Sequence, residues 1–72
     1  MNNMNLYFAS VIHADGTTTE GITMAANPIT AENRVRHFIE TRFPPEQHAI
    51  DIAIIKAQGG RNTIQVNWVA GS

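Results

Sequence analysis

Apolar and polar residues alternate along four short segments of the chain: residues 5–13, 17–26, 49–57 and 61–70. A period of two is typical of strands that bury one face, so each segment predicts a β-strand. Ala14-Asp15-Gly16 separates the first two segments and Gln58-Gly59-Gly60 the last two. Both triplets end in a glycine, which supplies the positive φ of a three-residue hairpin loop. The pattern therefore predicts two β-hairpins.

The loop class fixes the register of the first hairpin. A three-residue loop with Gly16 in the left-handed conformation pairs Phe8 with Ile22 and Leu6 with Met24. A slip of one residue would divide the apolar residues between the two faces. In the chosen register the apolar residues share one face, which we expect to be the buried one: Leu6, Phe8, Ile12, Ile22, Met24 and Ala26.

The second hairpin follows the same logic. The loop Gln58-Gly59-Gly60 pairs apolar residues across it in three pairs, Ile54 with Ile64, Ile52 with Val66 and Ile50 with Trp68. The opposite face of the sheet would then be uncovered. On that face, the central strands would carry an apolar strip with little charge: Tyr7, Ala9, Val11, Ala53 and Ile55.

One amphipathic helix is predicted between the hairpins, over residues 30–43. It follows Asn27-Pro28-Ile29, begins at Thr30 and stops before Pro44-Pro45. Apolar residues recur on one side at helical spacing: Ala31, Val35, Phe38, Ile39 and Phe43. The outer side carries charges four residues apart that predict ion pairs: Glu32, Arg36 and Glu40.

These elements predict an α+β fold of ββαββ type in one domain, residues 1–72. We expect a four-stranded antiparallel sheet with the helix packed on one face. Strand order 2-1-3-4 is favoured, because the helix then crosses over the first strand between strands two and three. Residues 1–4 and 71–72 are expected to be disordered.

Composition narrows the class of protein. The chain has 72 residues, no cysteine and a formal net charge of -1, from five basic and six acidic residues. The balance lacks the basic footprint of nucleic-acid binders, and without cysteine neither a disulfide nor a thiolate zinc site can form. No stretch approaches the roughly 20 apolar residues of a membrane helix. We expect a soluble cytoplasmic protein, in the host cytoplasm if a phage encodes it, with no membrane association.

Catalytic chemistry has few candidates. The three histidines fall on different predicted elements, and His37 with Glu40 alone is a weak metal signal because helical metal sites need ligands from other elements. There is no cysteine nucleophile, and no serine stands in a Gly-x-Ser-x-Gly setting. The sequence predicts a non-enzyme without cofactor or metal.

Partner binding has three candidate surfaces. The first is the helix surface, with candidate residues Arg34, Arg36, His37, Glu40 and Thr41. The second is the loop end near Arg61, and the third is the uncovered sheet face, with candidates Tyr7, Val11 and Ile55. We expect Tyr7 and Arg36 to act as anchors. The alternatives are a solvated helix face whose charges balance and a sheet face of ordinary exposed strand residues.

A small, cysteine-free, near-neutral domain of two hairpins and one helix resembles inhibitors encoded by phages and mobile elements, anti-CRISPR proteins in particular. The resemblance is one of layout and covers residues 5–70. It implies a protein that blocks a larger bacterial complex, such as a CRISPR–Cas complex, by occupying a functional surface. The alternative hypothesis is a self-associating adaptor that forms a homodimer through its open sheet face. A weak nucleic-acid binder ranks third, since only one aromatic residue is expected on that face.

Overall fold

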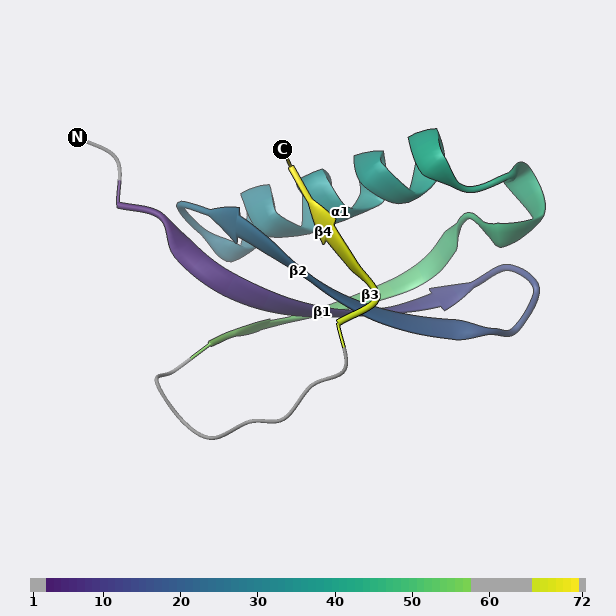
Figure 1. Cartoon of the computed structure of the whole chain (residues 1–72), viewed down its shortest axis with the longest axis horizontal. Coiled ribbons are helices and arrows are strands. Elements are labelled where there is room, and N and C mark those ends of the chain that lie inside the picture. The colour runs from purple at the N-terminus through teal and green to yellow at the C-terminus, as the bar shows by residue number, and fades with distance from the viewer. Residues whose placement is uncertain (1–2, 58–65, 72) are drawn as a thin grey trace.

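One helix lies on one face of a four-stranded sheet (Figure 1). The computed structural model describes residues 3–57 and 66–71. Its elements are β1 (Asn5–His13), β2 (Thr18–Ala25), α1 (Pro28–Arg42), the short 3-10 helix η1 (Pro45–Gln47), β3 (Ala49–Lys56) and β4 (Trp68–Ala70). The α+β class and the ββαββ order are confirmed.

The β1–β2 hairpin has the predicted register. Phe8 lies opposite Ile22 and Leu6 opposite Met24. Gly16 adopts φ 88°, and within the loop Asp15 Oδ1 accepts hydrogen bonds from the Thr17 amide (3.0 Å) and hydroxyl (2.6 Å). Local turn chemistry therefore sets this pairing.

The position of β4 differs from the prediction. The strand order is β3-β1-β2-β4, with β3 antiparallel to β1 as expected. β4, however, runs parallel to β2, with Trp68 opposite Gly21. The fully antiparallel order 2-1-3-4 and the pairing of Ile50 with Trp68 are therefore wrong. The loop predicted at Gln58-Gly59-Gly60 lies outside the described residues.

The contact between Trp68 and Gly21 explains why β4 lies beside β2. A Cβ atom placed on Gly21 would be 2.2 Å from Cδ2 of the Trp68 indole, so only glycine leaves room for the ring. The indole Nε1 also donates to Thr19 Oγ1 (3.2 Å), and its ring lies 5.4 Å from that of Phe38 on α1. Packing between distant segments, rather than a turn, places this strand.

The helix covers the opposite face of the hairpin from the one predicted. Tyr7, Ala9, Val11 and His13 of β1 are buried under α1, whereas Leu6 and Phe8 are only partly buried and Ile12 is exposed. Both alternating sets of β1 contain apolar residues, so alternation alone does not choose between them. The covered layer is rich in small residues, which allow helix and sheet to approach closely: Ala9, Gly21, Ala25, Ala31 and Ala70.

The helix begins earlier than predicted. Asn27 is its N-cap, with Oδ1 accepting from the Thr30 amide (2.8 Å), and Pro28 occupies the first helical position. The predicted apolar stripe is confirmed at its centre, because Ala31, Val35 and Ile39 are fully buried. Phe38 and Phe43 are partly buried and pack against the same core.

A buried polar chain joins the hairpin to the segment after the helix. His13 is 1% exposed, and its Nδ1 contacts the carbonyl oxygen of Gln47. Since a carbonyl only accepts, Nδ1 carries the hydrogen. The Thr19 hydroxyl donates to Nε2 (2.7 Å), and its oxygen accepts the Trp68 indole N–H. These hydrogen bonds connect β1, β2, β4 and η1, and they give each of the buried polar groups a partner.

Candidate functional site

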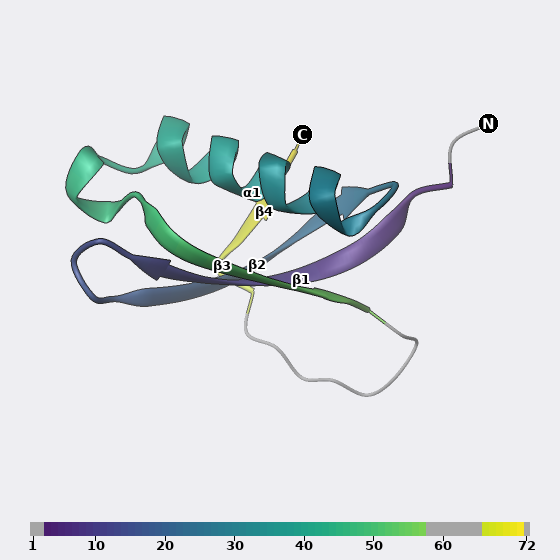
Figure 2. The same cartoon turned by 180° about the vertical axis from the view of Figure 1, so that it is seen from behind.

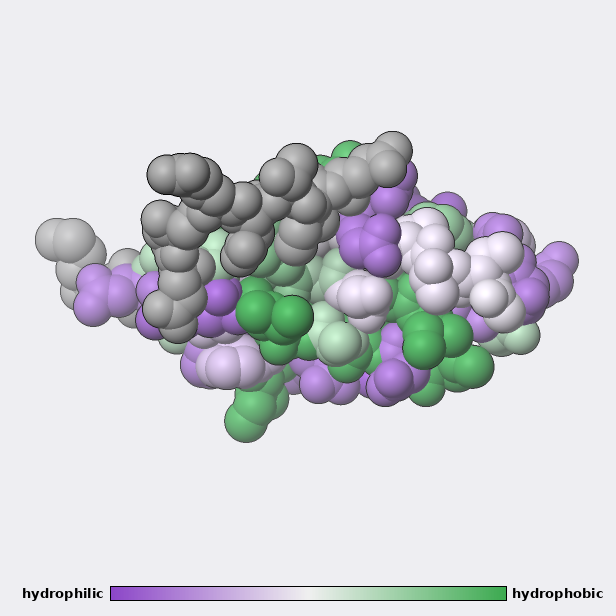
Figure 3. All heavy atoms as spheres, turned by 90° about the horizontal axis from the view of Figure 1, so that it is seen from below, coloured by the Kyte–Doolittle hydropathy of each residue, from purple (hydrophilic) through white to green (hydrophobic). Residues whose placement is uncertain are grey.

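The sheet face opposite α1 carries apolar residues on all four strands. Figure 3 shows this face from below, with several apolar groups separated by more polar ones. Ile55 of β3 lies opposite Phe8 of β1, Phe8 opposite Ile22 of β2, and Ile22 opposite Val69 of β4. Neighbouring apolar side chains on β1 and β2 extend this row at Leu6, Ile12 and Met24. We call this surface the open face. It crosses β3, β1, β2 and β4, and within residues 3–57 and 66–71 no helix covers it.

The open face leaves a substantial apolar area in water. Ile55 is 61% exposed, Val69 57%, Met24 44% and Ile12 38%, together equivalent to about two whole side chains. Burying one such side chain contributes about 1.5–3 kcal/mol, so covering this face would contribute about 3–6 kcal/mol on this protein's side alone. Exposed apolar residues gathered on one face in this way are typical of an interaction surface.

The charges on the open face are acidic. Glu20 pairs with Ser10, and Asp51 with Ile12, which places both carboxylates among the outward-facing residues. Lys56 pairs with the buried Tyr7 and so belongs to the other face. Among the described strand residues, the open face therefore has carboxylates and no basic side chain.

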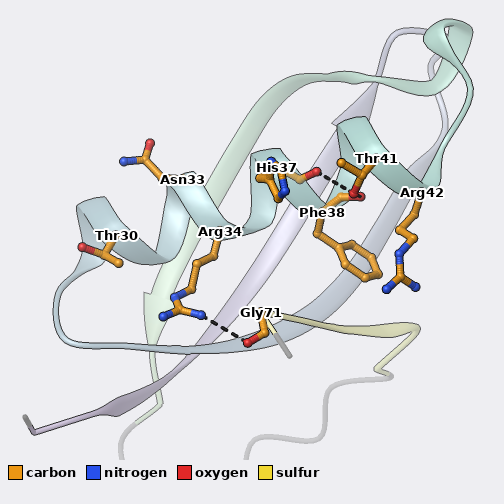
Figure 4. A pocket seen from close by; sticks show the side chains of 8 residues that line it. All are labelled: Thr30, Asn33, Arg34, His37, Phe38, Thr41, Arg42 and Gly71. Carbon is orange, nitrogen blue, oxygen red and sulfur yellow. Dashed lines mark hydrogen bonds between the residues drawn. The ribbon is translucent and has the colours of Figure 1, made fainter.

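A second surface is a groove of about 450 Å³ between α1 and the end of the chain beyond β4 (Figure 4). Arg34, Phe38 and Arg42 form one wall, and Gly71 lies opposite. Arg34 Nη1 donates to the Gly71 carbonyl (3.2 Å), and the Arg42 guanidinium lies over the Phe38 ring at 5.1 Å. His37 and Thr41 line its outer side. None of the described residues that line this groove is acidic.

The helix residues predicted to bind a partner are divided between two sides of α1. Arg34 and His37 line the groove. Arg36 instead pairs with Glu32 (3.0 Å) at the surface, as the charge spacing predicted, and Glu40 is exposed. The helix thus has a paired, balanced side and a basic side. Arg61 lies outside the described residues.

Two of the three sheet residues predicted to bind a partner are buried. Tyr7 is 2% and Val11 0% exposed beneath α1, because the helix covers their side of β1, so their predicted place on the uncovered face is wrong. Ile55 does lie on the open face. The residues missed are Phe8, Met24 and Val69. The signal for Phe8 and Met24 is the apolar set of the first hairpin that the alternation predicts to be buried, whereas Val69 belongs to a different strand.

Within residues 3–57 and 66–71 there is no group of three or more histidine, cysteine or acidic side chains that could hold a metal. The pKa of Asp15 is lowered to about 2, chiefly by the Thr17 hydroxyl and amide and also by the Gln47 side chain. These bonds close the hairpin loop, so the shift has a structural cause. No helix in this part of the chain is long and apolar enough to cross a membrane.

Comparison with known proteins gives no relative. No family model matches the chain, and neither the curated proteins nor the solved structures contain a match. The functional argument therefore rests on the two surfaces.

Proposed function

We propose that this chain is a non-catalytic protein-binding domain whose open face contacts another protein. The apolar row Ile55–Phe8–Ile22–Val69 is the observation that carries the proposal, since it extends over four strands and remains in water. Its apolar area matches the buried centre of a protein interface, and the two carboxylates match a polar rim.

Charge favours a different protein over a second copy as the occupant. In a stack of two open faces, Glu20 and Asp51 of each copy would meet no basic side chain on the described strands of the other copy, so the carboxylates would lose water without gaining an opposite charge. A partner with an apolar patch flanked by lysine or arginine fits better. The mode of action we propose is occupation of a functional surface on a larger complex.

The test compares one substitution at two exposed positions. Ile55 lies on the open face, whereas Ile29, 75% exposed, lies in the first turn of α1. Proteins captured from bacterial lysate by the tagged wild type, Ile55→Lys and Ile29→Lys are compared quantitatively, after circular dichroism has shown that all three fold. We expect a partner retained by the wild type and Ile29→Lys and lost with Ile55→Lys. A partner retained equally by all three contradicts the open face as the contact.

A homodimer through edge strands is the second candidate, favoured by the free edge of β3. The Ala57 amide donates to Leu6 O (2.9 Å), so by antiparallel alternation Phe8–Ile55 and Ser10–Ala53 are the hydrogen-bonded pairs. The backbone groups of Ile52, Ile54 and Lys56 then point away from β1. In the described residues no strand pairs with this edge, which is a template for strand addition.

Oligomeric state tests this second candidate. If β3 edges pair, analytical ultracentrifugation gives a dimer that Lys56→Pro dissociates and Lys56→Ala does not, because only proline removes the outward amide hydrogen. A monomer at 100 µM wild-type protein contradicts edge pairing and leaves the open face to a different protein.

A further inference from the structure

We propose that the groove between α1 and Gly71 binds an extended acidic peptide segment, with the pattern acidic–x–apolar–x–acidic. The groove and the open face lie on opposite sides of the sheet, because α1 and the groove are on the covered side (Figures 1 and 2). The inference therefore goes beyond the proposed function and does not depend on it. The two surfaces would let one small domain hold two segments at once.

The spacing of the groove wall matches that of a β-strand. Arg34, Phe38 and Arg42 are four residues apart, and Figure 4 shows all three side chains directed to the same side of α1, toward Gly71. Four residues of helix span about 6 Å. Alternate residues of an extended peptide lie on one side and are about 6.6 Å apart. Three alternate side chains of an extended peptide can therefore face Arg34, Phe38 and Arg42 in turn.

The charges of Arg34 and Arg42 determine which side chains fit at the first and last positions of the peptide motif. The ion pair recorded in the described part of the chain joins Arg36 to Glu32, and neither Arg34 nor Arg42 has a carboxylate within 4.0 Å there. Arg34 donates one N–H to the Gly71 carbonyl, and this bond fixes its side chain. The guanidinium has other N–H groups that can donate to a ligand. Guanidinium groups bind carboxylates through two parallel hydrogen bonds. An aspartate or glutamate at each end of the peptide motif therefore fits these positions.

The centre of the groove favours an apolar side chain over a nucleic-acid base. Phe38 is partly buried, lies 5.4 Å from the Trp68 ring and is covered at 5.1 Å by the Arg42 guanidinium. A base needs an open aromatic face on which to stack. A leucine or similar side chain needs only contact with the ring edge and the arginine stems. The observations therefore favour an acidic peptide over single-stranded nucleic acid.

Fluorescence anisotropy with labelled peptides tests the inference on the full chain. The probe is Ser-Glu-Ser-Leu-Ser-Glu-Ser, and a peptide of equal composition, Ser-Glu-Glu-Leu-Ser-Ser-Ser, disrupts the spacing. We expect the first to bind about threefold to fivefold more tightly than the second, because the second peptide loses one of the two charge pairs. Arg42→Gln should weaken binding of the first peptide by a similar factor, about threefold to fivefold, the upper part of the range of an exposed charge pair. Arg36→Gln is the matched control, because it removes the same charge outside the groove, and should change affinity less than twofold.

Three results would overturn the inference. They are no binding of the probe at 1 mM, equal affinity for the two peptides, and equal weakening by Arg42→Gln and Arg36→Gln. Displacement of the probe by an oligothymidine at lower concentration than by unlabelled peptide would assign the groove to nucleic acid instead. Ile55→Lys should leave peptide affinity unchanged, so failure of the open face and failure of the groove are separate outcomes.

Discussion

Gly21→Ala should destabilise this protein, although glycine-to-alanine changes in extended backbone are usually favourable. Where the backbone conformation suits it, alanine gains about 0.4–1 kcal/mol by restricting the unfolded chain. Here the new Cβ would be 2.2 Å from both Cδ2 and Cε3 of Trp68, which is 8% exposed and cannot move without opening the core. Overpacking of this kind costs about 1–3 kcal/mol. We expect a net loss of about 1–2 kcal/mol in the free energy of unfolding.

A double-mutant cycle isolates the contact. Gly21→Ala is measured by urea denaturation, followed by far-ultraviolet circular dichroism, in the wild type and in Trp68→Leu. In the Trp68→Leu background the clash is absent and Gly21→Ala should be neutral or stabilising, so the two sites couple by about 1–3 kcal/mol. Gly16→Ala is the control: its φ of 88° strains alanine, but no atom lies within 4 Å of the new Cβ, so its cost should be the same in both backgrounds. A Gly21→Ala effect that does not depend on Trp68 would refute the parallel pairing of β4 with β2.

Three further substitutions test the elements around the core. His13→Ala should lower the free energy of unfolding by about 2–4 kcal/mol in urea, because it leaves buried partners unsatisfied, whereas an equal loss for the exposed His37→Ala would contradict this. Asn27→Ala should cost about 1 kcal/mol by removing the N-cap, while Asn33→Ala, in the helix interior, should cost nothing; equal effects would argue against the cap. The pKa of Asp15 is about 2 in the folded protein and 3.8 in the free group. Its ionised form therefore stabilises the fold above about pH 4, and this contribution to the free energy of unfolding is lost as the pH falls toward 2. Asp15→Asn should therefore reduce the drop in urea midpoint between pH 4 and pH 2, and an unchanged drop would contradict the loop bonds.

Local chemistry made part of the fold predictable. The positive φ of Gly16 selected the loop class, and the loop class fixed the β1–β2 register. The helical spacing of Ala31, Val35 and Ile39 identified the buried stripe of α1. Each of these features depends on residues close together in the sequence, which is why a pattern of short range could find them.

The predictions that were wrong concern features that depend on residues far apart in the sequence. Alternation in β1 offers two apolar sets, and the choice between them follows from residue size: the helix packs on the set with Ala9, while the set with Phe8 stays open. The place of β4 follows from the fit of Trp68 over Gly21, 47 residues apart in the chain. The same applies to the groove. Its Arg34 wall is visible in the sequence as a helical repeat, but its opposite wall at Gly71 depends on β4 lying beside β2.

Photo-crosslinking from position 55 tests the role of the open face most directly. A photoreactive amino acid replaces Ile55 in one variant and Ile29, on the helix side, in another, and both are irradiated in bacterial lysate. We expect a single crosslinked species of higher mass from position 55, containing a different protein, and none of that mass from position 29. Crosslinks of the same protein from both positions, or none from position 55, would contradict the open face as the surface through which this domain acts.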